Sequence, residues 1–391
     1  MGFTRYLKAR TWLVLTLLPV IAAFLLLAVI PALEANAQQI PRARIEGVVL
    51  DAVSGKPLEG AHVFISRSAM GAVTNAEGFF RFTLPIGAHR IVVSIIGHQT
   101  QVADILVRSS GVYRSDFKLQ EEVLSLGPVT VTALRDLRRE KQLERFRNAF
   151  IGVTANAKEV IILNPEAIDF EEENGRLTAT AIEPLQIENR ALGYHLEHHL
   201  HEFVTQGEST WQDGESLFEE MVAESESQKA HWQQNRLKAY QGSVAHFFQS
   251  VVRNESREEG FQVHLVDDPG TVGEERQSER NFAAPLQKPQ FAVNPYNLLK
   301  PTETEGVFQM SFPKFVLVVY TREREDQQYA DWQKVFHSGQ ARDMQYSWLQ
   351  LRNGAATLDR QGNILEPYAF SYFGYLSFER LADLMPKEFR P

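Results

Sequence analysis

The sequence predicts a mainly β protein, with an N-terminal seven-stranded β-sandwich and a larger, β-rich α+β domain that contains one long helix. Three observations predict this class. Short runs of alternating apolar and polar residues recur between turn signals over residues 42–120. Further strand patterns occupy much of residues 148–391. Residues 228–254 instead repeat their apolar side chains at the helical period.

The first 37 residues have the pattern of a secretory signal peptide. Basic residues precede an almost wholly apolar run over residues 12–30, and Ala35-Asn36-Ala37 supplies a small-x-small cleavage site. We therefore expect cleavage before Gln38. The rival interpretation is an uncleaved membrane anchor, because the apolar run is nearly long enough to span a bilayer.

Composition narrows the compartment and the chemistry. The chain has no cysteine, which excludes disulfides, thiol catalysis and lipid attachment at cysteine. Its formal net charge of −9 argues against a nucleic acid as partner, because phosphate contacts need clustered cations. An exported protein without disulfides fits the envelope of a Gram-negative-type bacterium, in the periplasm or at the outer membrane and cell surface.

The sandwich is predicted from strands and turns in order. Turn signals stand at residues 54–57, 75–78 and 85–87, and Gly97 ends a strand. About seven strands and no helix are expected. The clearest strand patterns are residues 45–50, 61–66, 80–84, 89–96 and 113–119.

The turns and strand ends of the sandwich also carry a recognisable series of residues. The series is Asp51, Ser54, Gly55, Pro57, Leu58, Gly60, Ala61, Val63, Thr74, Asn75, Glu77, Gly78, Phe79, Pro85, Gly87, Ser94, Gly97 and His98. In this order the residues resemble the carboxypeptidase regulatory-like domain. The resemblance implies an immunoglobulin-like or transthyretin-like β-sandwich. It implies no peptidase activity, because such domains accompany an enzyme or a transporter and carry no catalytic residues.

The same kind of domain precedes TonB-dependent outer-membrane receptors, in which a short segment after the sandwich pairs with a periplasmic partner. Residues 128–133, Pro-Val-Thr-Val-Thr-Ala, resemble that segment. An extended, β-prone hexamer could add to the exposed sheet edge of a partner. The alternative is a final or linking strand.

Residues 121–147 are predicted to be a linker that ends in a short, charge-rich amphipathic helix over residues 135–147. The pattern favours a solvated connector, and contact with an acidic membrane surface is the alternative. Beyond it, Asn174-Gly175 predicts a tight hairpin. The long helix over residues 228–254 should bury one apolar stripe. The stripe consists of Leu237, Tyr240, Val244, Phe247, Phe248 and Val251.

A second series of residues resembles a segment that follows the same sandwich in bacterial envelope proteins and carries no activity known to us. The series is Asn164, Pro165, Glu183, Pro184, Leu185, Glu188, Asn189, Leu192, Gly193, Tyr194, Trp232, Asn235, Arg236, Ala239, Tyr240, Gly242, Ser243, His246 and Phe247. This resemblance supports the domain organisation and implies no function.

The histidines between residues 195 and 201 are the candidate metal ligands. In a strand, His195, Glu197, His199 and His201 point to one face. Alternate residues lie about 6.6 Å apart, close enough for two histidines to share a zinc ion, and a neighbouring strand would have to complete the site. The pattern favours a polar, exposed sheet face, with a metal site at His195, His199 and His201 as the alternative. The sequence indicates no other cofactor.

The long helix carries the candidate ligand-binding residues Arg236, Tyr240, Ser243 and His246. Arg236 and Ser243 lie along one edge of the apolar stripe, where an arginine can anchor a carboxylate and Tyr240 can stack on its guanidinium. The alternative is a half-buried polar network that holds the helix against the sheet. Ser243 and His246 do not indicate a hydrolase, because backbone amides in the middle of a helix are already bonded and form no oxyanion hole.

The sequence therefore predicts a non-catalytic, exported envelope protein that uses the sandwich as an interaction or spacer module. An envelope protein or a peptide is the expected partner, and association with a membrane is compatible with the pattern. Two alternatives are a peptide- or glycan-directed hydrolase and an accessory of TonB-dependent outer-membrane transport.

Overall fold

The computed structural model describes residues 41–391 apart from 123–132, 208, 267–290, 333–340 and 367. The predicted signal peptide therefore lies outside the described residues, as do residues 128–132 of the predicted partner-binding segment. Arg42–Pro391 form one compact unit. Its mainly β composition, with several antiparallel sheets and few helices, confirms the predicted fold class.

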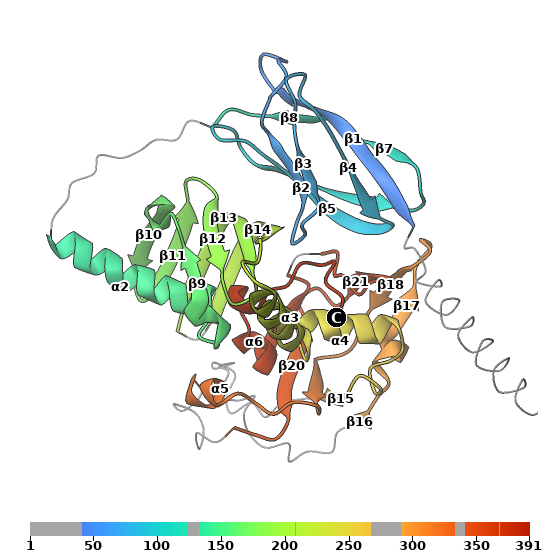
Figure 1. Ribbon diagram of the computed structural model, residues 1–391. Helices are drawn as coiled ribbons and strands as arrows, with labels where there is room; N and C mark the ends of the chain where they lie inside the picture. Colours follow the sequence, from blue (N-terminus) through green and yellow to red (C-terminus); the bar gives the residue numbers. More distant parts are fainter. Residues whose placement is uncertain (1–40, 123–132, 208, 267–290, 333–340, 367) are drawn as a thin grey trace, which may run out of the picture. The chain divides into compact units, whose positions relative to one another are not determined.

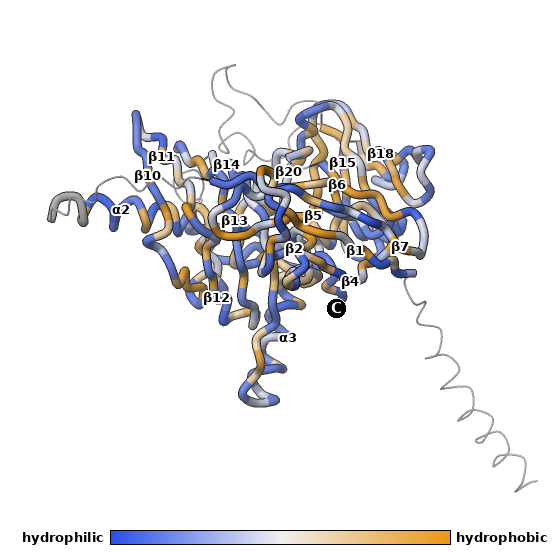
Figure 2. Tube along the Cα trace, turned by 90° about the horizontal axis from the view of Figure 1, so that it is seen from above, coloured by the Kyte–Doolittle hydropathy of each residue, from blue (hydrophilic) through white to orange (hydrophobic). Residues whose placement is uncertain are grey.

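The sandwich has eight described strands in two sheets (Figure 1). One sheet has the order β4-β1-β7, with β8 also on β1, and the other has the order β3-β2-β5-β6. Alternate side chains of β1 and β4 are buried between the sheets, and the hydrophobic stretch of β5 is visible in Figure 2. The strands are β1 (Arg42–Asp51), β2 (His62–Ile65), β3 (Gly71–Val73), β4 (Phe79–Pro85), β5 (Gly87–Ser94), β6 (Gln101–Val107), β7 (Val112–Arg114) and β8 (Phe117–Leu119).

The last predicted strand of the sandwich, residues 113–119, is in fact two strands. β7 and β8 both pair with β1 in parallel, and they are interrupted at Ser115 and Asp116. The side chain of Asp116 accepts a hydrogen bond from the backbone amide of Val48 at 3.1 Å. At this point a side-chain oxygen thus takes the place of a backbone carbonyl as the partner of β1. The amide of Ser115 meanwhile donates to the carbonyl of Glu46 at 3.0 Å.

The next sheet is built around the long strand β13. Its path is β10-β11-β13-β12-β9, and β14 pairs along β13. Asn174 and Gly175 join β10 to β11 with φ angles of 49° and 77°, which confirms the predicted hairpin. The strands are β9 (Val160–Ile162), β10 (Ile168–Glu173), β11 (Arg176–Ala181), β12 (Leu185–Asn189), β13 (Tyr194–Gln206) and β14 (Ser209–Glu220).

Two further sheets enclose another hydrophobic core. Their orders are β16-β15-β19-β20-β22 and β17-β18-β21. The strands are β15 (Phe261–Val266), β16 (Phe291–Ala292), β17 (Leu299–Pro301), β18 (Val307–Met310), β19 (Phe315–Tyr320), β20 (Gln345–Leu351), β21 (Ala356–Asp359) and β22 (Phe370–Gly374). Two short helical segments connect these strands, namely the 3-10 turn η4 (Pro295–Leu298) and α5 (Gln327–Trp332). Helix α6 (Tyr375–Phe378) and the 3-10 turn η5 (Leu381–Asp383) follow β22, and the 3-10 turns η1 (Asn156–Glu159) and η2 (Pro165–Ala167) lie earlier in the chain.

Helix α2 (Ala133–Phe150) is longer than the predicted helix and is not a solvated connector. Phe146 and Phe150 are fully buried, stack on each other, and meet the ring of Phe203 of β13 edge to face. Arg145 donates to the carbonyl oxygens of Gly175 and Thr205. The charge-rich pattern did not predict that Phe146 and Phe150 would pack against the sheet, and these contacts make the helix part of the core around β13.

The predicted long helix over residues 228–254 is two helices, α3 (Glu226–Tyr240) and α4 (Val244–Val252). The chain breaks at Gly242, whose φ of +77° is left-handed. Ser243 then begins α4, because its Oγ accepts the amide of His246 at 3.2 Å. Because the two helices do not share one axis, the six predicted apolar residues do not form one buried stripe. Leu237 is 39% exposed.

Three side chains of α3 hold the turn between β12 and β13. Trp232 Nε1 donates to the carbonyl of Arg190, and Asn235 Nδ2 donates to that of Ala191, both at 2.8 Å. Arg236 Nε donates to the carbonyl of Leu192 at 2.7 Å. The turn's carbonyl groups are thus satisfied by the helix rather than by water.

Replacing Gly193 with alanine should destabilise the protein. Gly193 has a φ of +69°, and an added Cβ would lie 2.3 Å from the ring of Trp232. Backbone strain and the clash together should lower the free energy of unfolding by roughly 2–4 kcal/mol. Gly175→Ala is the matched control: its φ is +77°, but no atom lies within 4 Å of the added Cβ. It should cost only about 1 kcal/mol. Chemical denaturation measures both, and equal losses would contradict the packing argument.

Candidate functional site

The connection between β2 and β3 docks the sandwich on the edge of β14. The amide of Arg67 donates to the carbonyl of Ser216 at 2.7 Å, and the amide of Phe218 donates to that of Ser68 at 2.9 Å. Ser68 and Leu217 consequently form a parallel β-bridge. On the other side, the amide of Lys387 donates to the carbonyl of Arg67 at 2.8 Å. The sandwich therefore covers part of a sheet edge that would otherwise expose unpaired backbone groups.

Glu215 of β14 is the charged centre of this docking contact. It is 7% exposed, accepts a hydrogen bond from Ser66 Oγ, and lies 3.3 Å from Arg90 Nη1 of β5. Arg90 also forms a two-pronged pair with Asp104 of β6, at 2.8 and 3.0 Å. The Asp104 carboxylate raises the pKa of Arg90 above its usual value. The guanidinium of Arg90 thus joins the exposed carboxylate of Asp104 in the sandwich to the buried carboxylate of Glu215 in the sheet around β13.

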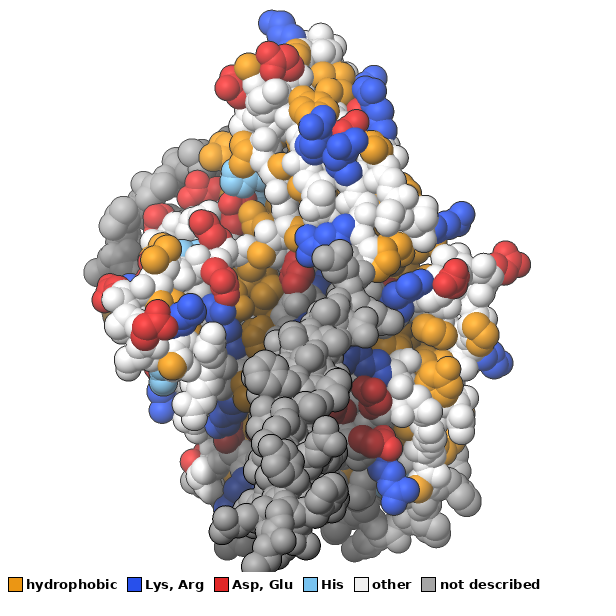
Figure 3. All heavy atoms as spheres, turned by 45° about the vertical axis from the view of Figure 1, so that its right-hand side comes forward, with side chains coloured by type: hydrophobic (Ala, Val, Ile, Leu, Met, Phe, Trp, Pro, Cys, Tyr) orange, Lys and Arg blue, Asp and Glu red, His pale blue; other side chains and the backbone are white. Residues whose placement is uncertain are grey.

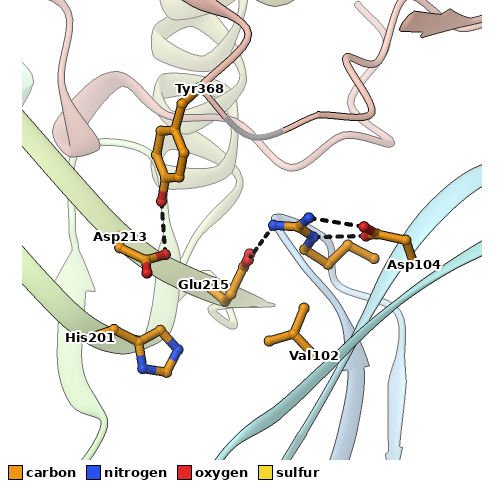
Figure 4. Close-up of a pocket in the computed structure, with 7 residues that line it drawn as sticks. Val102, Asp104, His201, Asp213, Glu215 and Tyr368 are labelled. Atoms are coloured by element: carbon orange, nitrogen blue, oxygen red, sulfur yellow. Dashed lines mark hydrogen bonds and ion pairs between the residues drawn. The ribbon is translucent and has the colours of Figure 1, made fainter.

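A pocket of about 440 Å³ lies beside this contact (Figure 4). The hydroxyl of Tyr368 donates a hydrogen bond to Asp213 at 2.8 Å. Burial, and to a lesser extent the contact with Asp213, raises the pKa of this tyrosine. The carboxylates that line the pocket are already paired, with Arg90 or with Tyr368. The arrangement therefore suits recognition of a polar group better than proton transfer. The lining residues are Arg90, Val102 and Asp104 of the sandwich and His201, Asp213, Glu215 and Tyr368.

Sequence reasoning missed most of this pocket. One signal that could have been used is the spacing of Asp213 and Glu215, which places both on one face if residues 209–220 form a strand. Arg90 and Asp104 belong to another sheet, and Tyr368 lies far along the chain. Their meeting depends on the docking of the sandwich, which no local pattern discloses.

The predicted metal ligands His195, His199 and His201 lie on β13 but do not converge. His199 is 4% exposed, because Phe64 of β2 packs on its ring at a centroid distance of 5.3 Å. His195 is half-buried, and His201 is exposed beside a register shift in the pairing with β14. The expected exposed face is therefore wrong at His199, which the sandwich covers. Metal binding by these histidines stays a prediction.

Glu197 links the histidines of β13 to the sandwich. Its two carboxylate oxygens lie 2.9 Å from His199 Nε2 and 3.2 Å from His62 Nδ1 of β2. Burial opposes ionisation of Glu197, but the hydrogen bonds from His199 and His62 outweigh it and lower its pKa to about 2. The same contact raises the pKa of His62. Next to them, burial lowers the pKa of His198 to about 3, and its Nδ1 hydrogen-bonds Ser216 Oγ at 2.8 Å.

Within the described residues, one group of three potential ligands does converge. Single ligand atoms of Asp51, His98 and Glu121 all lie within 4.8 Å of one another. The group belongs to the sandwich and was not singled out as a metal site from the sequence, although Asp51 and His98 are part of the first resemblance.

Arg236 does not stack on Tyr240 as predicted. Its guanidinium lies over the ring of Tyr194, 4.1 Å from the centroid, and donates to the carbonyl oxygens of Leu192 and Gly193. It also pairs with Glu220 of β14. Tyr240 instead hydrogen-bonds the side chain of Gln249. Arg236 therefore takes part in the half-buried network that was the alternative interpretation.

Ser243 and His246 form a separate network at the start of α4. Ser243 Oγ accepts the amide of His246, and His246 Nδ1 accepts the amide of Gly242 at 3.1 Å. His246 Nε2 lies 3.3 Å from Glu259 Oε2, and burial lowers the pKa of this histidine. Each of these polar groups has a structural hydrogen bond. Binding of a ligand by Arg236, Tyr240, Ser243 and His246 stays a prediction.

Comparison with known proteins identifies the sandwich. Residues 45–131 match the family described as the CarboxypepD_reg-like domain, so the chain contains such a domain, as the first series of residues indicated. The match runs past the predicted end of the sandwich at residue 120.

One curated relative is a TonB-dependent receptor. The TonB-dependent receptor SusC of Bacteroides thetaiotaomicron is 28% identical over 130 residues, which is 33% of this chain and 12% of SusC. The chain thus spans about an eighth of that relative. The shared domain and the likeness fit an envelope protein of a Gram-negative bacterium or an accessory of TonB-dependent transport. In the part of the chain that the structure describes, we find no helix with the length and apolarity of a membrane span.

Solved structures resemble the chain only weakly. The minor pilin GBS52 of Streptococcus agalactiae matches at 15% identity and a TM-score of 0.19, over 23% of this chain and 49% of the pilin. A putative carbohydrate binding protein of Bacteroides uniformis matches at 13% identity and a TM-score of 0.18, over 40% of this chain and 58% of that protein. Scores of this size support no conclusion about function.

Glu215→Ala should weaken the docking of the sandwich. It removes the acceptor of Ser66 Oγ and leaves Arg90 with one carboxylate, so the free energy of unfolding should fall by about 2–3 kcal/mol. Asp104→Ala is the matched control on the same guanidinium. Its side chain is 65% exposed, and the loss should stay below about 1 kcal/mol. Denaturant titration of both variants measures the difference, and a larger loss for Asp104→Ala would contradict the assignment.

Glu197 should contribute stability that depends on pH. Because its pKa falls from 4.5 to about 2 on folding, the contribution is complete above pH 4.5 and is lost as the pH falls towards 2. Glu197→Gln should therefore be less stable than the parent by on the order of 2–3 kcal/mol near pH 6, with the gap closing in acid. Denaturation across pH 2–6 measures this. Glu219→Gln, at an exposed position of β14, is the control. A gap that stays constant with pH would refute the role of Glu197.

Proposed function

We propose that this chain is a non-catalytic, exported envelope protein that serves TonB-dependent outer-membrane transport as an accessory. In this proposal the sandwich and the sheet around β13 act together as one binding body. The observation that carries the proposal is the docking of the CarboxypepD_reg-like domain on β14 by backbone hydrogen bonds and by Glu215. A module built in this way holds its position for a partner instead of acting as a loose spacer.

Two contacts support a non-catalytic role. The histidine–carboxylate pairs His199–Glu197 and His246–Glu259 are the kind that a hydrolase would use as a base. His199, however, lies beneath Phe64, and Ser243 beside His246 caps α4 through its hydroxyl. Neither pair presents a nucleophile with a free base and an oxyanion hole, which acyl transfer requires.

The surface charge supports a protein or peptide partner. On the face that Figure 3 shows, Lys and Arg side chains are interspersed with Asp and Glu side chains, without a broad basic area. Together with the net charge of −9, this fits a protein partner better than a nucleic acid. The β-prone residues 128–133 are the segment through which a TonB-type partner would add a strand.

Replacing residues 128–133 with a glycine-serine segment of equal length should weaken recovery of the protein on an immobilised periplasmic domain of a TonB-type protein. The replacement removes the β-prone side chains and keeps the chain length. An equally long replacement within residues 267–290 is the matched control and should be recovered like the parent. Unchanged recovery of the first variant would refute the transport role. Fractionation of cells should also place the protein with the envelope, and a cytoplasmic position would refute export.

A further inference from the structure

Three segments of the sandwich bring potential metal ligands together. Asp51 ends β1, His98 lies between β5 and β6, and Glu121 follows β8. One ligand atom from each lies within 4.8 Å of the other two. None of the three takes part in the docking of the sandwich on β14, so the fold leaves the group available for another task.

The backbone fixes the positions of these residues. His98 and Glu121 form an antiparallel β-bridge. On either side of it, the amide of Gln99 donates to the carbonyl of Gln120, and the amide of Glu122 donates to that of Gly97, both at 2.8 Å. The ladder thus holds Glu121 opposite His98 before any ligand binds.

Asp51 is oriented by its own turn. Its Oδ1 accepts hydrogen bonds from both the amide and the hydroxyl of Ser54, each at 2.6 Å. These bonds leave Oδ2 as the oxygen that faces His98.

The atoms that face one another lack hydrogen bonds. The Asp51 side chain is 8% exposed and that of His98 is 13% exposed. Asp51 Oδ2 and His98 Nε2 are in ion-pair contact at 3.4 Å without a hydrogen bond between them, and His98 Nδ1 is buried without a hydrogen-bond partner. Buried polar atoms are normally satisfied, and a bound ion or water molecule is one explanation for those that are not.

The distances suit a small divalent cation. His98 Nε2 and Asp51 Oδ2 are 3.4 Å apart. In a tetrahedral zinc site with bonds of about 2.1 Å, two ligand atoms lie about 3.4 Å from each other. The exposed side chain of Glu121 can close on the ion, and a water molecule would take the fourth position. We propose that Asp51, His98 and Glu121 bind a divalent transition-metal cation, for which Zn²⁺ is the probe.

A simpler arrangement would have the same geometry. Asp51 and His98 could pair with each other at 3.4 Å and bind nothing. The two arrangements differ in one consequence. A bound metal would link β1, the β5–β6 connection and the residues after β8 through a single ion, whereas the ion pair links only the first two. The proposal is also independent of the transport role, because none of these three residues lies within residues 128–133.

The test is a titration of the purified, metal-free protein with Zn²⁺ against a chromophoric chelator, together with thermal unfolding with and without the ion. We expect one saturable site and a higher midpoint of unfolding with Zn²⁺. His98→Gln should weaken binding by at least about tenfold and remove the thermal shift, since it deletes the only nitrogen ligand. Glu121→Gln changes an exposed side chain, so it should fold like the parent and still bind more weakly.

The controls address the chain's 11 histidines. His231→Gln alters an exposed histidine on α3 and should bind Zn²⁺ like the parent. His201→Gln tests the histidines of β13. The proposal is overturned if Zn²⁺ does not saturate a site, if His98→Gln and Glu121→Gln bind as tightly as the parent, or if affinity is lost only in His201→Gln.

Discussion

The open edge of β14 is the constraint on which the arrangement of the compact unit depends. Unpaired amides and carbonyl groups at a sheet edge invite association with other chains, and residues 66–68 of the sandwich cover them here through two backbone hydrogen bonds. Covering the edge buries Glu215, whose charge then needs Ser66 and Arg90 as partners. It also places Phe64 over His199. The pocket and the histidine cluster are therefore consequences of one docking event.

A second constraint is the turn between β12 and β13. Its carbonyl groups face α3, and Trp232, Asn235 and Arg236 satisfy them. Gly193 is required because its φ is positive and Trp232 leaves no space for a side chain. Trp232, Asn235 and Arg236 on the predicted helix thus hold the turn in place.

Sequence patterns predicted the elements that depend on interactions between residues close together in the chain. Alternation predicted the sandwich strands, and Asn174-Gly175 predicted its hairpin because only a left-handed turn fits that spacing. The sequence could not show that Asp116 would interrupt the last strand by bonding the amide of Val48, or that α2 would bury Phe146 and Phe150. The burial of His199 and the pairing of Glu215 with Arg90 depend on residues more than 100 positions away, and no periodicity within either segment reports such contacts.

The backbone hydrogen bonds of Arg67 to Ser216 and Lys387 have a consequence for the order of folding. The core of the sandwich consists of contacts within residues 42–122. Two hydrogen bonds of its docking turn, however, need residues 320 positions later: the carbonyl of Arg67 accepts the amide of Lys387, and Ser68 donates to the carboxylate of Glu388. Closing a loop of that size is slow compared with forming a hairpin. A sandwich that folds first would therefore leave its docking turn uncovered until the last segment of the chain arrives. During that interval, the turn and the edge of β14 are the places where a chaperone would have most to protect.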